Sequence, residues 1–248
     1  MLKRWRYVGI YDRELMLCVG IARIGPVRQA WWAVWDRESR ELLERTHLLR
    51  GRGRVQVSDG GAAVRDGGVE IDLALARAPG VEVVTPDPGG YAWTRKQVVP
   101  ASGHVRAGDR EWTVDGRALI DDSAGYHPRR TSWRWSAGTG TLADGRAVAW
   151  NLVDGVHDSA RDSERTLWLE GEPSELEPVV FEADLRAVRF TQGAELRFSA
   201  EATRRRDDNL VVFRSRYEQP FGEFSGTLPG GLELAEGHGV MERHDAVW

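Results

Sequence analysis

Short runs in which apolar and polar residues alternate occur along the whole chain, and this pattern predicts β-strands. Side chains of an extended strand point alternately to opposite faces, so each run can present one face to a core and the other outward. Such runs lie at residues 54–58, 69–76, 131–135 and 146–152. Clusters of Gly, Pro and Asp separate the runs, among them Asp59-Gly60-Gly61 and Asp66-Gly67-Gly68, which are turn-forming sequences. The pattern therefore indicates an all-β chain.

Helical periodicity is weak throughout the sequence. The best candidate for a helix is the acidic segment 170–177, which Pro173 and Pro178 keep short because proline lacks the amide hydrogen that a helix needs. By contrast, the apolar runs at 29–35 and 42–46 flank a polar segment at 36–39. This arrangement is typical of a β-hairpin.

A weak internal repeat divides the chain into two halves. Gln97, Ser102-Gly103 and residues 116–121 are echoed by Gln219, Ser225-Gly226 and residues 237–242. We therefore predict two domains, 1–133 and 134–248, each an antiparallel β-barrel that arose by internal duplication. Barrels of about eight strands can enclose one small ligand. The duplication requires residues 116–121 and 237–242 to lie in equivalent strands.

The composition is that of an ordinary globular protein: 41% of the 248 residues are hydrophobic and 29% are charged. No apolar run is long enough to cross a bilayer, so no integral membrane contact is expected. The formal net charge of −4 gives no general attraction to nucleic acid. Because the N-terminal residues lack the apolar region of an export signal, and the single cysteine, Cys18, lies in an apolar run, we expect a cytoplasmic location.

The mid-chain segment 125–135 combines polar, cationic and aromatic residues more densely than a plain core strand needs. Trp133 and Trp135 are spaced so that both indoles share one strand face. Pro128 fixes the backbone just before this strand, which shapes its entry. From this segment and the strand that follows it we take as candidate ligand-binding residues Tyr126, Arg129, Arg130, Trp133, Trp135, Trp150 and Asn151. We further expect Arg129 or Arg130 to pair with an acid at the mouth of a cavity.

The sequence also resembles a known family. The segment 125–135, followed by Asp144-Gly145-Arg146, Trp150-Asn151-Leu152 and the closing residues 239–244, resembles the family of domain of unknown function 2804 (DUF2804). Residues 3–7 and 42–46 resemble that family too. The family is in turn distantly similar to double lipocalin-like proteins that include carotenoid hydratases and fungal Diels–Alder cyclases. The resemblance implies two tandem lipocalin-like, or calycin-type, barrels.

Four residues are candidates for catalysis: Asp121, Asp122, Glu242 and His127. A carboxyl group whose pKa is raised by burial could protonate an alkene, and indole faces would stabilise the resulting positive charge. Asp121 and Glu242 occupy matching places in the repeat, however, and a residue that both halves need is typical of a structural role. Either role remains open at the level of sequence.

Other chemistries find little support. His157-Asp158-Ser159 are neighbours on one predicted loop, where they cannot form a catalytic relay. No cluster of His, Cys or acidic residues has the spacing of a metal site, and no glycine pattern of a nucleotide-binding loop occurs. No metal and no cofactor are therefore expected.

Three functions are compatible with the sequence. The first is binding of a small hydrophobic molecule in a Trp-rich barrel pocket. The second is a cofactor-independent hydratase, isomerase or cyclase that acts on a terpenoid-like or polyketide-like substrate through a buried carboxylate. The third is a packed structural scaffold without a ligand. A small hydrophobic molecule is thus the expected partner, and the sequence does not decide whether the protein is an enzyme.

Overall fold

The computed structural model describes residues 1–48, 53–87, 90–210 and 213–248. Within these ranges the chain forms strands β1–β19 and no helix, so the all-β prediction is confirmed. The helix expected at 170–177 is wrong: β14 (Glu172–Glu175) lies there and pairs with β13 (Thr166–Leu169). Because β14 ends the hydrogen-bonded path of its sheet, the missing amide hydrogen of Pro173 can be tolerated there.

The chain divides into two compact units, each of which is described by itself. Unit 1 comprises Met1–Glu82 and Gly90–Tyr126, and unit 2 comprises Val83–Gly89 and His127–Trp248. The domain boundary expected after Trp133 would cut β11 (Arg130–Leu142), a continuous strand that lies wholly in unit 2. The chain enters unit 2 at Val83, returns to unit 1 at Gly90, and passes into unit 2 again at His127, in the proline-containing segment before β11.

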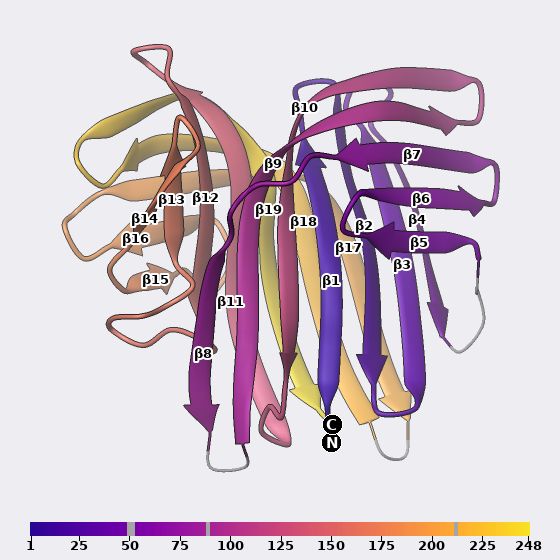
Figure 1. The fold of residues 1–248 in the computed structure, drawn as a ribbon. Helices are drawn as coiled ribbons and strands as arrows, with labels where there is room; N and C mark the ends of the chain where they lie inside the picture. Colours follow the sequence, from indigo (N-terminus) through magenta and orange to yellow (C-terminus); the bar gives the residue numbers. More distant parts are fainter. Residues whose placement is uncertain (49–52, 88–89, 211–212) are drawn as a thin grey trace. The chain divides into compact units, whose positions relative to one another are not determined.

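Unit 1 is built on one antiparallel sheet (Figure 1). Its strands follow the order β4-β3-β2-β1-β10-β9-β7-β6-β5, and β8 (Val81–Asp87), whose residues from Val83 onward belong to unit 2, lies off this path. The strands are β1 (Lys3–Tyr11), β2 (Leu15–Ile24), β3 (Val27–Asp36), β4 (Glu41–Leu48), β5 (Val55–Ser58), β6 (Gly61–Asp66), β7 (Val69–Leu75), β9 (Gly90–Ala107) and β10 (Arg110–Gly125). The antiparallel pairing of β3 with β4 confirms the predicted hairpin.

Unit 2 is built on a second antiparallel sheet, coloured from magenta to yellow in Figure 1. Its order is β14-β13-β12-β11-β19-β18-β17-β16-β15. The strands not yet given are β12 (Ala147–Asp154), β15 (Val179–Phe181), β16 (Ala187–Phe190), β17 (Glu195–Leu210), β18 (Phe213–Leu228) and β19 (Leu232–Val247).

The two strand orders are the same, which confirms the predicted duplication. In each unit the first strand pairs with the last strand, β1 with β10 and β11 with β19. Residues 116–121 lie in β10 and residues 237–242 lie in β19, as the repeat requires. The register agrees as well, because Asp121 lies opposite Tyr7 of β1 and Glu242 lies opposite Trp135 of β11.

One face of each sheet carries an apolar core, and we call it the inner face; the other is the outer face. In unit 1 the core cluster joins Trp32 of β3 to Val55 of β5, strands near opposite ends of the path. The sheet must therefore curl around its own core, as barrel-like sheets do. The core cluster of unit 2 includes Trp150, Phe224 and Met241. Alternation then places the neighbours of these core residues on the outer faces.

Candidate functional site

Four of the predicted site residues lie together on the outer face of unit 2. Trp133 and Trp135 come from β11, Asn151 from β12 and Glu242 from β19. Trp135 lies directly opposite Glu242, while Trp133 lies opposite His244. Directly opposed residues of antiparallel strands share a face and touch. The spacing of the two indoles therefore brings both onto the strand pair that carries the carboxylate.

The contacts of Glu242 include hydrogen bonds from two neutral N–H donors. Its side chain is buried, since the residue is 8% exposed. The indole Nε1 of Trp133 donates to Oε1 at 2.8 Å, and the amide Nε2 of Gln219 donates to Oε2 at 2.9 Å. Such bonds fix the carboxylate plane without adding charge of their own. The carboxylate of Glu242 is thus oriented, buried and placed beside aromatic rings.

A row of partly exposed rings lies next to Glu242. The imidazole of His244 lies 4.3 Å from the Trp133 ring and 5.3 Å from the Tyr217 ring, centroid to centroid. Its Nε2 lies 2.7 Å from the hydroxyl of the buried Ser215. These rings form a surface on which a flat apolar molecule could stack.

Arg204 of β17 completes the arrangement. The residue is buried and lies opposite Gln219, and its guanidinium stands 5.6 Å from the centroid of the Tyr217 ring. Guanidinium groups stack on aromatic faces and supply hydrogen bonds to oxygen atoms. We use the name outer patch for the set of Trp133, Trp135, Arg204, Tyr217, Gln219, Glu242 and His244. It offers a carboxylate, an imidazole and a guanidinium along one four-stranded face.

The imidazole of His244 is neutral at physiological pH. Burial lowers the pKa of His244 to about 4, because desolvation disfavours the imidazolium, even though the charges of Asp245 and Asp208 act in the opposite direction. The unfolded chain binds a proton at this residue below its ordinary pKa, and the folded chain does so only near pH 4. The folded state therefore loses stability as the pH falls from the ordinary pKa of histidine, about 6.5, to about 4.

We expect the His244→Gln variant to lose that part of the pH dependence. Between about pH 6.5 and pH 4 the free energy of unfolding of the wild type should fall by up to about 3 kcal/mol more than that of the variant. Urea unfolding at several pH values measures the difference. His104→Gln, which changes an exposed histidine of unit 1, is the control and should retain the wild-type slope. Equal slopes for the wild type and His244→Gln would show that the imidazole is not desolvated.

Trp150 and Asn151 do not act together, although they are adjacent in β12. Trp150 lies on the inner face in the core of unit 2, where its Nε1 donates to Ser136 Oγ at 3.2 Å. Asn151 is buried on the outer face, where Oδ1 accepts from Trp135 Nε1 at 2.7 Å and Nδ2 donates to the backbone carbonyl of Glu164 at 2.8 Å. Alternation along the strand separates them. Asn151 is thus tied to Trp135 and the backbone, and Trp150 to the core.

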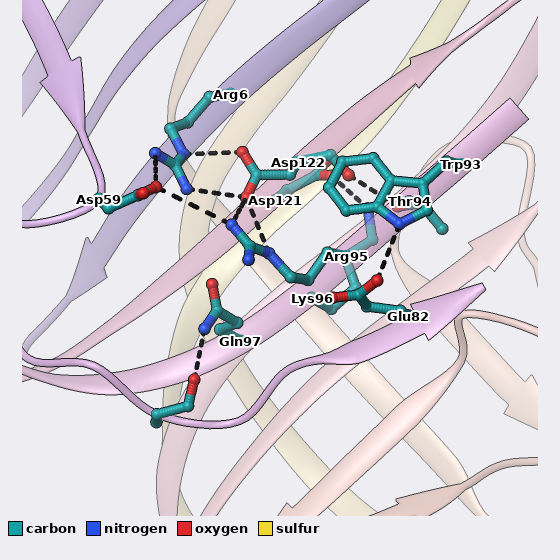
Figure 2. A network of polar contacts seen from close by, with 11 residues as sticks. Arg6, Asp59, Glu82, Trp93, Thr94, Arg95, Lys96, Gln97, Asp121 and Asp122 are labelled. Carbon is teal, nitrogen blue, oxygen red and sulfur yellow. Dashed lines mark hydrogen bonds and ion pairs between the residues drawn. The ribbon is translucent and has the colours of Figure 1, made fainter. Parts of the chain in front are cut away.

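Asp121 and Asp122 lie in unit 1 on opposite faces of β10. Asp121 forms an ion pair with the buried Lys96 on the outer face. Asp122 receives Arg6 and Arg95 on the inner face, and Figure 2 shows both guanidinia converging on its carboxylate. Lys3 and Lys96 are the only lysines of the sequence, and both are buried. Their rarity beside so many arginines is a signal that could have singled out Lys96.

The remaining candidates come from the segment between the units. Tyr126 belongs to unit 1, is exposed, and contacts the Tyr91 ring edge-on at 6.3 Å. His127 belongs to unit 2, is buried, and contacts the His157 ring edge-on at 5.9 Å.

Arg129 and Arg130 are both exposed, and neither forms an ion pair with any described residue. The ion pair expected at Arg129 or Arg130 is therefore absent from the described part of the chain, because no described acidic side chain reaches either guanidinium. This absence removes the argument for an anchoring role of these two arginines.

Sequence reasoning missed His244, Tyr217 and Arg204. The signal that would have found two of them is the spacing that singled out Trp133 and Trp135. Tyr217 lies two positions before Gln219, and His244 lies two positions after Glu242, so each shares a face with a residue already quoted in the repeat. Arg204 carries no comparable signal, because arginines are abundant in this sequence.

No group of three or more His, Cys, Asp or Glu side chains among the described residues is arranged to hold a metal ion. No helix in the described ranges is long and apolar enough to cross a membrane.

Comparison with known families gives one match. The model of the family described as Domain of unknown function (DUF2804) matches residues 50–248. The resemblance suspected from the mid-chain segment and the closing residues is thereby confirmed. Residues 1–49 lie outside the matched range, so the likeness of residues 3–7 and 42–46 to the family stays a prediction. No curated protein matches the sequence.

Solved structures share the fold across nearly the whole chain. A protein from Nitrosomonas europaea, provisionally assigned as AttH, has a TM-score of 0.62 at 16% identity and covers 98% of this chain and 91% of its own. Kievitone hydratase from Nectria haematococca has a TM-score of 0.61 at 10% identity, and the match covers 97% of this chain and 88% of the hydratase chain. CghA in complex with Sch210972 has a TM-score of 0.53 at 12% identity, and the match covers 99% of this chain and 88% of the CghA chain. The fold is thus the double lipocalin-like fold that the sequence predicted.

Proposed function

The chain belongs to the DUF2804 family, and from that premise we propose that it binds a small hydrophobic molecule on the outer patch of unit 2. The observation that carries the proposal is the buried Glu242 carboxylate, which two neutral N–H donors orient beside partly exposed aromatic rings. A plain apolar core has no use for such a group, because burying a carboxylate is costly. A binding site uses one to select a polar substituent on an otherwise apolar ligand.

The two faces of the unit 2 sheet differ in how deeply their aromatic rings are buried, and this difference supports a site on the outer face. The inner face of unit 2 carries the core cluster, in which Trp150 is fully buried, so the barrel interior that the sequence suggested is occupied by side chains at that point. The outer patch instead contains rings of intermediate exposure, those of Trp133, Tyr217 and His244. These rings supply apolar area, and Glu242 supplies the polar contact.

Binding of a fluorescent apolar probe, 8-anilinonaphthalene-1-sulfonate, tests the proposal. Replacing Trp133 by Ala should weaken binding of the probe by roughly tenfold, because the indole contributes about 1–3 kcal/mol through its apolar area and ring contacts. Trp112→Ala in unit 1 is the matched control, since Trp112, like Trp133, is a partly buried indole. Denaturant midpoints measured on both variants separate lost affinity from lost folding. Equal weakening by the two variants would contradict the proposal.

A second candidate function, proton-transfer catalysis, is favoured by the presence of Glu242 and a neutral His244 on the same face of β19, two positions apart. A hydratase or isomerase needs one group that gives a proton to the substrate and another that takes one from water or substrate. Glu242 in its protonated form would serve as the donor, and the imidazole of His244, whose pKa is lowered to about 4, would serve as the acceptor. The likeness to kievitone hydratase makes this chemistry worth testing. Uptake of labelled oxygen from water by a molecule that co-purifies with the protein would distinguish turnover from binding.

A further inference from the structure

A compact ion cluster lies on the inner face of unit 1. Arg6 of β1 and Arg95 of β9 both lie directly opposite Asp122 of β10, on its two neighbouring strands. Arg6 donates from Nε to Oδ1 of Asp122 at 2.7 Å and from Nη2 to Oδ2 at 2.9 Å. Arg95 donates from Nη2 to Oδ2 at 2.9 Å. Two guanidinium groups therefore share one carboxylate, which holds both in fixed positions.

A second carboxylate approaches the same guanidinia from a turn. Asp59 lies between β5 and β6, and its Oδ1 is 2.6 Å from Nη1 of Arg6 and 4.0 Å from Nη2 of Arg95. Figure 2 shows the Arg6 guanidinium between the carboxylates of Asp59 and Asp122. The side chain of Asp59 is 73% exposed, whereas those of Arg6 and Asp122 are 15% and 10% exposed. Asp59 is thus the loosely held member of the cluster.

The charges show what Asp59 contributes. Arg6 and Arg95 together carry two positive charges, and Asp122 balances one of them. Asp59 balances the other, and its hydrogen bond to Arg6 lowers the pKa of its carboxyl group, so it remains ionised at neutral pH. An exposed ion pair of this kind contributes little to stability. If Asp59 turned away into solvent, two ordered guanidinium groups with one net positive charge would remain.

Unit 2 has an equivalent turn, but the atom that this turn brings to an arginine is a backbone carbonyl oxygen. The turn between β15 and β16 reaches Arg243, whose Nη1 donates to the backbone carbonyl of Ala183 at 3.3 Å. Arg243 in turn pairs with Glu218 at 2.6 Å, and Arg205 pairs with the same carboxylate at 2.8 Å. Both units therefore place two arginines on one carboxylate and bring a turn oxygen to them. Only in unit 1 is that oxygen an exposed, exchangeable carboxylate.

We propose that Asp59 occupies the place of a ligand carboxylate, and that unit 1 binds a small aromatic carboxylic acid through Arg6 and Arg95 when the Asp59 side chain moves aside. Guanidinium groups recognise carboxylates through paired hydrogen bonds, and a rigid arrangement lowers the cost of ordering them. Trp93 lies on the same strand face as Arg95, two residues away, and Cζ of Arg95 is 5.7 Å from its ring centroid. Its partly exposed indole provides a flat surface for the ring of the ligand. This site is separate from the outer patch and does not depend on the function proposed for it.

Removing the competing charge should reveal the site. We expect Asp59→Asn to bind benzoate at least about tenfold more tightly than the wild type, because the ligand no longer displaces a like-charged group from the guanidinia. Benzamide, the uncharged analogue, should show no such gain. Asp184→Asn in the β15–β16 turn is the matched control, since Asp184 is an exposed turn acid paired with a nearby arginine, and it should leave benzoate affinity unchanged. Calorimetric titration provides the affinities.

A second variant assigns the binding to the arginines. Adding Arg95→Gln to Asp59→Asn should abolish the gain, and adding Arg95→Lys, which keeps the charge and loses the fork, should reduce it. Inorganic phosphate serves as a second probe: tighter binding of phosphate than of benzoate would contradict the assignment to aromatic carboxylates. Equal benzoate affinity in the wild type, Asp59→Asn and Asp184→Asn would overturn the proposal. Asp59 is exposed, so Asp59→Asn should fold, and a thermal melt confirms this.

Discussion

Replacing Asp66 by Ala is expected to lower the free energy of unfolding by about 3–5 kcal/mol, the loss typical when one member of a buried charge cluster is removed. The side chain of Asp66 is 1% exposed at the end of β6. Its Oδ2 accepts from Trp32 Nε1 at 2.9 Å and lies 2.6 Å from Nε2 of His47. Its Oδ1 accepts from Arg45 at 3.1 Å and from Arg54 at 3.3 Å. The variant would leave the buried indole N–H of Trp32 without its acceptor.

The same carboxylate should make unit 1 sensitive to acid. Burial alone would raise the pKa of Asp66, but hydrogen bonds from Trp32 and His47 and the nearby positive charges lower it to about 2. A lowered folded-state pKa gives stability that is present at neutral pH and is lost as the pH falls from about 4 towards 2, amounting to roughly 2 kcal/mol. Chemical denaturation at several pH values measures both effects. Asp72→Ala, which breaks an exposed pair with Arg65, should cost less than about 1 kcal/mol. If Asp66→Ala lowered the free energy of unfolding by no more than Asp72→Ala does, the contacts of Asp66 would contribute nothing to stability.

The second large effect is expected at Trp150. Replacing it by Ala should cost about 3–5 kcal/mol, the range for removing a large aromatic side chain from a packed core. Trp150 is 0% exposed, and its ring meets that of Phe224 edge-on at 5.0 Å. The indole also packs closely over the backbone of Gly138, where an added Cβ would come within 2.2 Å of its Cζ2 atom. Neighbouring side chains cannot easily fill the cavity left by a ring that fits so closely.

Denaturant unfolding of Trp150→Ala and Trp133→Ala provides the comparison. Trp133 is partly exposed on the outer patch. Compared with Trp150→Ala, Trp133→Ala should therefore lower the free energy of unfolding less and weaken binding of the probe more. Trp150→Ala should retain affinity for the naphthalene probe in the fraction that remains folded. A Trp150→Ala variant that kept its stability and lost the probe would restore Trp150 to the binding site and contradict its role in the core.

The fold could be predicted from the sequence because it depends on periodic features. Alternation and turn residues locate strands, and a repeat implies that equivalent strands are paired in the same order. The face shared by Trp133 and Trp135 followed from the same alternation. In contrast, alternation does not say which face is the core, so Trp150 and Asn151 were grouped although the sheet separates them. Arg129 has no acidic partner among the described residues, because ion pairs depend on which distant segments meet.

Asp66 illustrates the limit more sharply. In Asp66-Gly67-Gly68 the aspartate has the sequence of an ordinary turn, and a turn does follow it. Its carboxylate, however, is buried by contacts with Trp32, His47, Arg45 and Arg54, the first of which is 34 positions away along the chain. Asp59, in a similar Asp-Gly-Gly sequence, stays exposed. The same Asp-Gly-Gly sequence thus contains a buried carboxylate at Asp66 and an exposed one at Asp59, and only the tertiary structure distinguishes them.

The charged pairs on the inner faces have a consequence for how a duplicated chain avoids misfolding. In unit 1, Arg95 of β9 faces Asp122 of β10; in unit 2, Glu218 of β18 faces Arg243 of β19. The positions are equivalent and the signs are exchanged. If β9 paired with β19 by mistake, Arg95 would face Arg243, and β18 on β10 would set Glu218 against Asp122. Directly opposed like charges destabilise strand pairing. Exchange of these strands between the two copies, a characteristic failure of tandem repeats, would therefore be opposed by charge repulsion at this pair.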